Sequence, residues 1–138
     1  MKNFILMLLC LSPFYAVKGQ DKDILGTWNL ISWANIGDAG SDKRTEDQLK
    51  AENQSTLYMF LTDGKFKMTT NMAGSGEMEN YDGTWKTSEK NLTITLKIGE
   101  QNADLKNIWE IRHDTLILTR VIPEQSLKII NTFRKQKD

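Results

Sequence analysis

Behind an apolar N-terminal run, the chain consists of short stretches in which apolar and polar residues alternate. In the clearest stretch, Leu92, Ile94 and Leu96 alternate with threonine and lysine. A period of two is typical of a β-strand with one buried face and one solvent-facing side. The same reading predicts eight strands along the chain, at 24–35, 55–62, 66–70, 77–87, 92–98, 105–111, 116–120 and 127–133.

Short turns separate most of these runs. Asp63-Gly64 between two apolar alternations predicts a two-residue hairpin. Closing the hairpin there would pair Leu61 with Phe66 and Met59 with Met68, with all four side chains on the inner face.

A four-residue turn over 88–91 would likewise place Trp85 opposite Ile94. A series of hairpins this long avoids exposed strand edges most simply by closing on itself. The sequence therefore predicts an all-β, eight-stranded antiparallel up-and-down barrel, which has room for packed side chains or one small ligand.

The exception to the alternation is the polar segment 37–54, after the first strand. A short helix is expected there from Asp42 to Lys50, with Ser41 or Asp42 as its cap. The predicted outer face carries three aromatic residues, which would pack under this helix or form a self-association patch. They are Trp33, Tyr58 and Phe60.

The beginning of the chain has the features of an export signal. Lys2 precedes an almost continuously apolar run from Phe4 to Ala16, and Gly19 is a small residue before the charged Asp21-Lys22-Asp23. These features predict a signal peptide over 1–19, cleaved after Gly19, and the run is too short for a membrane span. We therefore expect one domain, 20–138, that is periplasmic or secreted and has no membrane span.

Cysteine and charge exclude several classes of protein. Cys10 lies inside the apolar run with Leu9 before it, where lipidation requires a small residue, so we expect neither a lipoprotein nor a disulfide in the mature chain. Removing Lys2 and Lys18 from 18 basic residues leaves 16, against 18 acidic residues. This balance does not fit a nucleic-acid-binding surface.

Gly26-Thr27-Trp28 opens the first predicted strand, and Arg134 follows Thr132-Phe133 near the end of the chain. In these features the sequence resembles the lipocalin-like families of the calycin group. With its signal peptide, small size and Gln20 after the cleavage site, it is similar to the short secreted lipocalin-like proteins of Bacteroidetes-type bacteria. The resemblance implies that Arg134 packs across Trp28. The family's Thr-Asp-x-x-Tyr landmark is absent, and the segment 36–54 is too short for the two-helix lid of the fatty-acid-binding proteins, which share the Gly-Thr-Trp opening.

In a meander the turns alternate between the two ends, so the inward residues can be assigned to each end. Large apolar residues dominate the end that contains the turns at 63–64, 88–91 and 113–114. The predicted structural floor there consists of Trp28, Trp85 and Phe133, with Arg134 against it. Inward polar residues gather toward the opposite mouth, and apolar walls with a few polar groups are typical of ligand sites.

The predicted ligand-binding residues lie mainly at this mouth: Ser32, Met72, Tyr81, Asn107, Trp109 and Arg120. Arg120 stands out because a guanidinium matches the geometry of a carboxylate or phosphate head group. The alternative is that a bulge turns Arg120 outward or that its side chain extends to solvent. Asn107 and Asn131 are expected to bond a ligand, a bulged backbone or a water.

Catalysis finds no support in the residues. His113 is the one histidine and falls in a predicted turn at the apolar end, so no metal-ligand set or cofactor site is indicated. Two hypotheses remain for a monomer or weak homodimer. Either the barrel binds a small, mostly apolar or amphipathic ligand, or a filled barrel acts through its outer surface as an inhibitor, protein-interaction or envelope module. An enzyme at the barrel mouth is a third, weaker option, and the volume of the interior distinguishes the first two.

Overall fold

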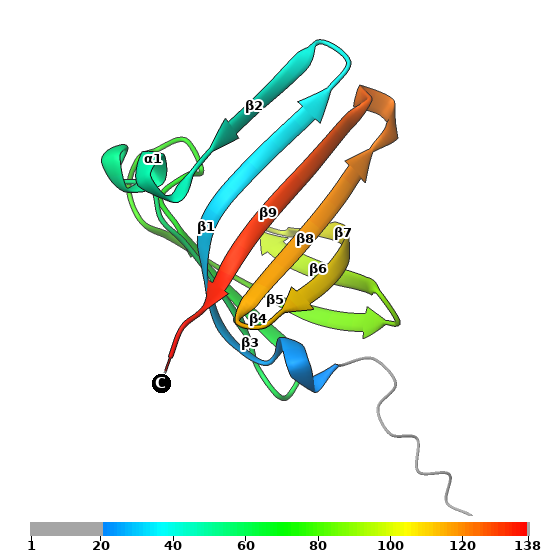
Figure 1. The fold of residues 1–138 in the computed structure, drawn as a ribbon. Coiled ribbons are helices and arrows are strands. Elements are labelled where there is room, and N and C mark those ends of the chain that lie inside the picture. The colour runs from blue at the N-terminus through cyan, green and yellow to red at the C-terminus, as the bar shows by residue number, and fades with distance from the viewer. Residues whose placement is uncertain (1–20, 138) are drawn as a thin grey trace, which may run out of the picture.

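The computed structural model describes residues 21–137, so the predicted signal peptide and Cys10 lie outside the described residues. One nine-stranded antiparallel sheet makes up almost the whole domain (Figure 1). Its strands are β1 (Gly26–Gly37), β2 (Gly40–Arg44), β3 (Thr56–Phe60), β4 (Lys65–Thr70), β5 (Glu79–Ser88), β6 (Asn91–Ile98), β7 (Gln101–Arg112), β8 (Thr115–Ile122) and β9 (Leu127–Lys135). The helical segments are η1 (Lys22–Ile24), α1 (Glu46–Ala51) and η2 (Pro123–Gln125).

Eight of these strands close into a barrel. The order is β1-β3-β4-β5-β6-β7-β8-β9, and β9 pairs back onto β1 over almost its whole length. Closure satisfies the backbone groups that an open sheet would expose at its edges. The predicted eight-stranded up-and-down barrel is therefore confirmed, and so is the pairing of Trp85 with Ile94.

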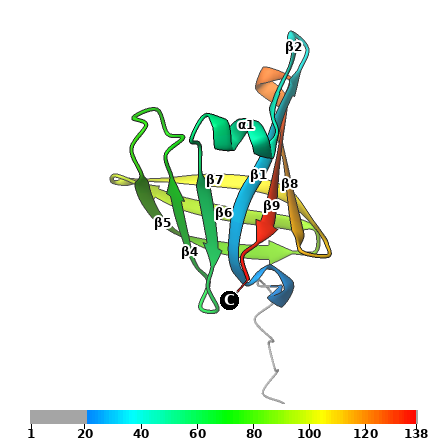
Figure 2. The same cartoon turned by 60° about the vertical axis from the view of Figure 1, so that its left-hand side comes forward.

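The segment after β1 differs from its prediction. Gly40–Arg44 is not helical but forms β2, which pairs with the second half of β1. The helix begins later, because Thr45 caps it and exchanges reciprocal hydrogen bonds with Gln48. Figure 2 shows the β1–β2 hairpin projecting beyond the barrel, with α1 beside its base.

The hairpin between β3 and β4 has a different register from the predicted one. Phe60 pairs with Phe66 and Tyr58 with Met68, and the chain turns at Gly64 with a φ of 78°. The loop is thus one residue longer than a two-residue turn, and a one-residue slip moves every side chain of β3 to the other face. Tyr58 and Phe60 are consequently buried inside the barrel, and the prediction that they face outward under the helix is wrong.

A β-bulge in β1 produces a second reversal. Leu30 pairs with Phe133 but Ser32 pairs with Thr132, so Ile31 is the extra residue. Trp33 therefore aligns with Asn131 on the inner face, where the uninterrupted alternation had predicted an outward tryptophan.

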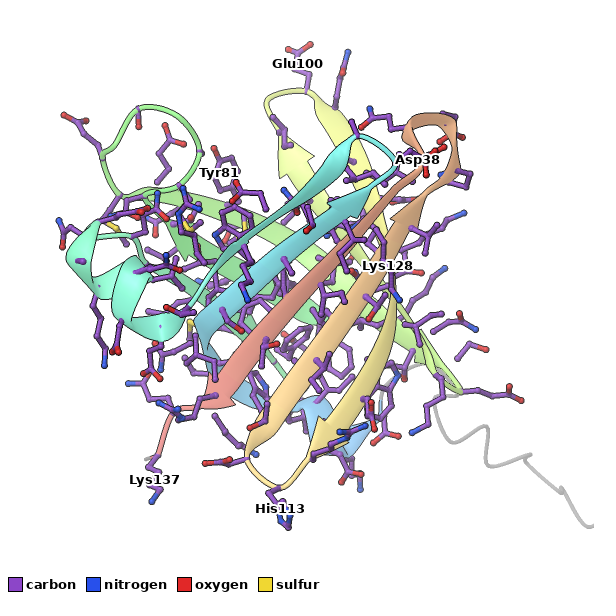
Figure 3. The ribbon with its side chains drawn as sticks, turned by 45° about the horizontal axis from the view of Figure 1, so that its top comes forward. Asp38, Tyr81, Glu100, His113, Lys128 and Lys137 are labelled. Atoms are coloured by element: carbon purple, nitrogen blue, oxygen red, sulfur yellow. The ribbon has the colours of Figure 1, made fainter. Side chains whose placement is uncertain are left out.

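Tight packing fills the end of the barrel where β1 begins. Its core includes Ile24, Trp28, Phe60, Phe66, Trp85, Leu92, Ile94, Leu116 and Phe133, each at most 2% exposed. Aromatic rings meet edge to face within it, as for Phe60 and Trp85 at 5.4 Å between centroids. We call this end the floor and the opposite end, with the β4–β5, β6–β7 and β8–β9 turns, the mouth. Figure 3 shows Asp38, Tyr81 and Glu100 toward the mouth and His113 and Lys137 toward the floor.

Three tryptophans tie the floor to its loops. The indole nitrogen of Trp28 donates to the carbonyl of Ile24 in η1 at 2.7 Å. Trp85 donates to Leu61 at 3.0 Å, and Trp109 donates to Glu89 at 3.0 Å. Each bond joins a buried ring to the backbone of a different connecting segment, so the floor is closed by both packing and hydrogen bonding.

Candidate functional site

A cavity of about 340 Å³ lies inside the mouth half of the barrel. Its lining residues come from β1, β3, β4 and β9 and from the start of the β4–β5 turn: Leu30, Trp33, Asn35, Thr56, Tyr58, Met68, Thr70, Met72, Ala73, Asn131 and Phe133. This volume is within the range of small-molecule pockets, which are largely apolar with a few placed polar groups. The barrel therefore has a pocket, open to solvent, above part of its floor.

One side of the cavity has its polar groups already paired. The hydroxyls of Thr56 and Thr70 lie 2.7 Å apart on neighbouring strands. Thr56 also lies 3.3 Å from the sulfur of Met72. These contacts connect β3, β4 and the following turn and leave a mostly apolar, polarizable surface for a ligand.

The opposite side carries polar groups without such partners. Asn35 and Asn131 line the cavity from β1 and β9, and neither side chain forms a hydrogen bond within residues 21–137. The indole N–H of Trp33 is buried, and it also has no partner in the described part of the chain. This wall can therefore offer both donors and acceptors to a bound molecule.

A positive charge stands beside this cavity. Arg120 pairs with Ile129 in the ladder, which places it on the same face as the buried Leu116 and Leu118. Its Nε lies 3.4 Å from the amide oxygen of Asn107, itself only 4% exposed. Among residues 21–137, no carboxylate forms an ion pair with Arg120.

Tyr58 lines the cavity and lies close enough to Arg120 to feel its charge. Burial raises the pKa of the Tyr58 hydroxyl, and the nearby charge of Arg120 lowers it by a smaller amount. The phenol therefore stays neutral near pH 7. The arrangement suits an anionic head group more than a neutral one.

The structure brings together some of the predicted ligand residues. Met72 lines the cavity, and Asn107 contacts Arg120 next to it. Tyr81 pairs with Met68, but its hydroxyl donates to Glu79 at 2.7 Å, which raises the pKa of Tyr81. Contact of any of these residues with a ligand stays a prediction.

Two predicted ligand residues lie elsewhere. Ser32 follows the bulge and belongs to an outer groove beside β2, so it does not face the cavity. Trp109 is part of the floor, where its ring is fixed to Glu89 and lies beneath the ammonium of Lys90 at 4.8 Å.

The basic residue next to Trp28 is also different from the expected one. Lys135 pairs with Trp28, and its Nζ lies 5.5 Å from the ring centroid. Arg134 pairs with Asn29, so it projects from the other face of β9 and binds Glu46 of α1 at 2.9 and 3.1 Å. Arg134 therefore anchors the helix and not the floor.

The predicted alternation turns four of the cavity residues to the outer face, namely Trp33, Asn35, Thr56 and Tyr58. All four depend on the bulge in β1 or on the extra residue in the β3–β4 loop. No glycine or proline marks the bulge at Ile31. The available signal was the Thr62-Asp63-Gly64 sequence, which fits a three-residue loop ending in glycine as well as a two-residue turn.

A larger groove of about 530 Å³ lies on the outer face, across β4 to β7. It follows a split in the sheet, because β5 pairs with β6 only from Gly83 onward. At Gly83 the two backbones approach so closely that a side chain would overlap the carbonyl oxygen of Thr95. Exposed lysines line the groove, among them Lys65 and Lys67, so it is a solvated, charged surface.

Within the described residues, no three histidine, cysteine or acidic side chains are grouped so that they could hold a metal ion. A search of residues 21–137 found no helix with the length and apolar character to cross a membrane.

The closed antiparallel barrel with a pocket at its mouth is the architecture of a lipocalin-like fold. A sequence model of the lipocalin-like domain matches residues 24–119. The chain therefore belongs to the lipocalin-like domain family.

Comparison with solved structures gave two examples of similar shape. One is the wild-type fluorescent protein UnaG, with 11% identity, a TM-score of 0.46, and coverage of 83% of this chain and 98% of that one. The other is a fatty acid binding protein of Schistosoma mansoni in complex with arachidonic acid, with 16% identity, a TM-score of 0.45, and coverage of 84% and 98%. No curated protein matches the sequence.

Proposed function

We propose that this protein binds a small amphipathic molecule in the barrel and does not transform it. The anionic head group would interact with Arg120, and the apolar part would occupy the 340 Å³ cavity against Leu30, Met68 and Phe133. The observation that carries the proposal is Arg120, a cation on the inner face without a carboxylate partner among residues 21–137. A barrel that only needed a stable core would gain more from an apolar residue at this half-buried, inward-facing position, since a partly desolvated charge without a counter-ion is unfavourable.

The alternative of a filled barrel acting through its outer surface loses its main support. Two of the three aromatic residues that would have formed the outer patch, Tyr58 and Phe60, are buried in the core at 6% and 1% exposure. The third, Trp33, lines the cavity.

The proposed location is the periplasm or the medium, with the chain starting at Gln20 after removal of 1–19. The intact mass of the protein recovered from an expression host would test this. A mass that includes residues 1–19 would count against export.

The binding test uses the mature protein and dodecanoic acid. Native mass spectrometry after incubation with a lipid extract should first show an adduct in the mass range of a fatty acid. Titration with dodecanoic acid should then give an affinity about tenfold to a hundredfold weaker for Arg120→Met, which corresponds to the loss of one charge-assisted hydrogen bond.

Arg112→Met is the matched control. Arg112 lies on the adjacent strand but is exposed and pairs with Glu110, near the floor end of β7. Its replacement removes the same charge from the protein and should leave the affinity unchanged. An empty wild-type protein, or equal binding by Arg120→Met, would refute the proposal.

A further inference from the structure

The four tryptophans of the chain divide into two groups by what their indole N–H groups do. Trp28, Trp85 and Trp109 each donate to a backbone carbonyl, at 2.7 to 3.0 Å. The N–H of Trp33 is buried and donates to nothing within residues 21–137. Buried donors in native proteins almost always have a partner, so an orphaned one calls for a partner from outside the chain.

Trp33 stands where such a partner would be a ligand. The bulge at Ile31 turns its side chain to the inner face, and it lines the cavity together with Asn35 and Asn131. Asn131 is its direct partner in the ladder, yet the amide forms no bond with the indole. Both polar groups thus belong to residues of the same wall, and neither has a partner within residues 21–137.

The ring of Trp33 is also held in place. The guanidinium of Arg44 lies 5.5 Å from the ring centroid, and β2 brings Arg44 directly opposite Trp33. Glu52 at 3.0 Å and Asp42 at 2.9 Å hold Arg44 in turn. A donor that is already oriented binds an acceptor without a further loss of side-chain freedom.

Trp33 and Arg120 reach the interior of the barrel from different strands. Trp33 is on β1 and Arg120 on β8, and β9 lies between these two strands. Two inter-strand spacings put the backbones about 10 Å apart. A ligand whose head group binds Arg120 can therefore place a second group, farther along the same molecule, at Trp33.

From this geometry we propose that Trp33 recognises a neutral hydrogen-bond acceptor, a carbonyl or hydroxyl oxygen, within the apolar part of the ligand. The ligand that we expect is therefore an amphipathic acid with an oxygen substituent in its apolar part, such as an oxo or hydroxy fatty acid. This inference rests on the proposed function, because Arg120 must hold the anionic end.

The test compares dodecanoic acid with its keto derivatives, in which the carbonyl is moved along the chain. Wild-type protein should bind at least one keto acid about tenfold more tightly than dodecanoic acid, because the acceptor satisfies a donor that is otherwise unpaired. Trp33→Phe should lose the preference for the keto acid, measured as the ratio of its own affinities for the keto acid and for dodecanoic acid, so that a change in the cavity wall common to both ligands cancels. Trp85→Phe, which removes an indole from the floor, should keep that preference.

A second readout does not depend on the variant folding. In wild-type protein labelled with ¹⁵N, the indole N–H resonance of Trp33 should move downfield with the keto acid and stay nearly unchanged with dodecanoic acid. The resonance of Trp28 should not move with either.

The outcomes separate the two proposals. If Trp33→Phe keeps the keto preference, or wild type shows none, the role of Trp33 is refuted while binding at Arg120 stands. If no acid binds wild type, the proposed function fails and this inference fails with it.

Discussion

The two ends of this barrel use the same residue type in opposite ways. At the floor, Trp28, Trp85 and Trp109 are at most 5% exposed, and each bonds the backbone of a connecting segment. At the mouth, Trp33 is only partly buried and its N–H has no partner among the described residues. The difference shows which end holds the fold together and which end keeps polar groups available for another molecule.

The strongest test of this comparison removes a floor tryptophan. Trp28→Ala should lower the free energy of unfolding by about 3–5 kcal/mol, because it empties a large buried volume in a close-packed region. Met72→Ala at the cavity should cost less than about 1 kcal/mol, because this side chain is partly exposed and already borders open space. Urea unfolding followed by circular dichroism measures both, and similar losses would contradict the division into floor and mouth.

A finer test concerns the indole N–H groups alone. Trp85→Phe should lower the free energy of unfolding by about 1–2 kcal/mol more than Trp33→Phe does, because only Trp85 gives up a hydrogen bond and strands a carbonyl. Both substitutions shrink the ring by the same amount, and the difference combines the lost bond with the tighter packing around Trp85. Equal losses in urea unfolding would mean that the Trp33 N–H is satisfied in solution.

The smallest expected effect is the response to acid. Glu46 accepts hydrogen bonds from Arg134 and forms an ion pair with Lys50. These contacts hold the pKa of the Glu46 carboxyl below the usual glutamate range. The contacts that anchor α1 therefore stabilise it fully at pH values above the usual glutamate pKa range. This stabilisation is lost as the pH falls through the lowered pKa of Glu46. Amide exchange at Leu49, the buried residue of α1, should accelerate there.

Two controls accompany the acid response of α1, one at the floor of the barrel and one in a variant of Glu46. The indole protons of Trp28 and Trp85 should show no change over the same pH range, since their acceptors are carbonyls that do not titrate. Glu46→Gln should remove the pH dependence at Leu49. Acid loosening of the floor before α1 would reverse the comparison.

The floor was predictable because its pattern and its register agree. In β5 and β6, Trp85 and Ile94 are opposite each other both in the predicted alternation and in the observed strand pairing. Large apolar side chains in strict alternation permit one inner face only, and burial then determines the register. The eight-stranded barrel followed from that consistency and from the turn residues.

The mouth was not predictable in the same way. Because the β3–β4 loop has one extra residue, Tyr58 faces inward where Met59 was predicted. Because of the bulge at Ile31, Trp33 faces inward where Ser32 was predicted. Both segments mix apolar and polar residues on each side, so neither phase is strongly preferred by sequence. Packing against the neighbouring strands decides between the two phases, and that information is spread over the whole barrel.

By itself, then, the sequence determined the class of fold and the apolar floor around Trp28, since these depend on periods and turns that local residues specify. It left two orientations open for Arg120, and the strand pairing decided for the inner face. Only the tertiary structure decided which side chains line the cavity. A period-two pattern cannot record a single inserted residue, because the alternation on each side of it remains intact while its facing reverses. Trp33 thus came to face the cavity with an N–H that the rest of the described chain does not use.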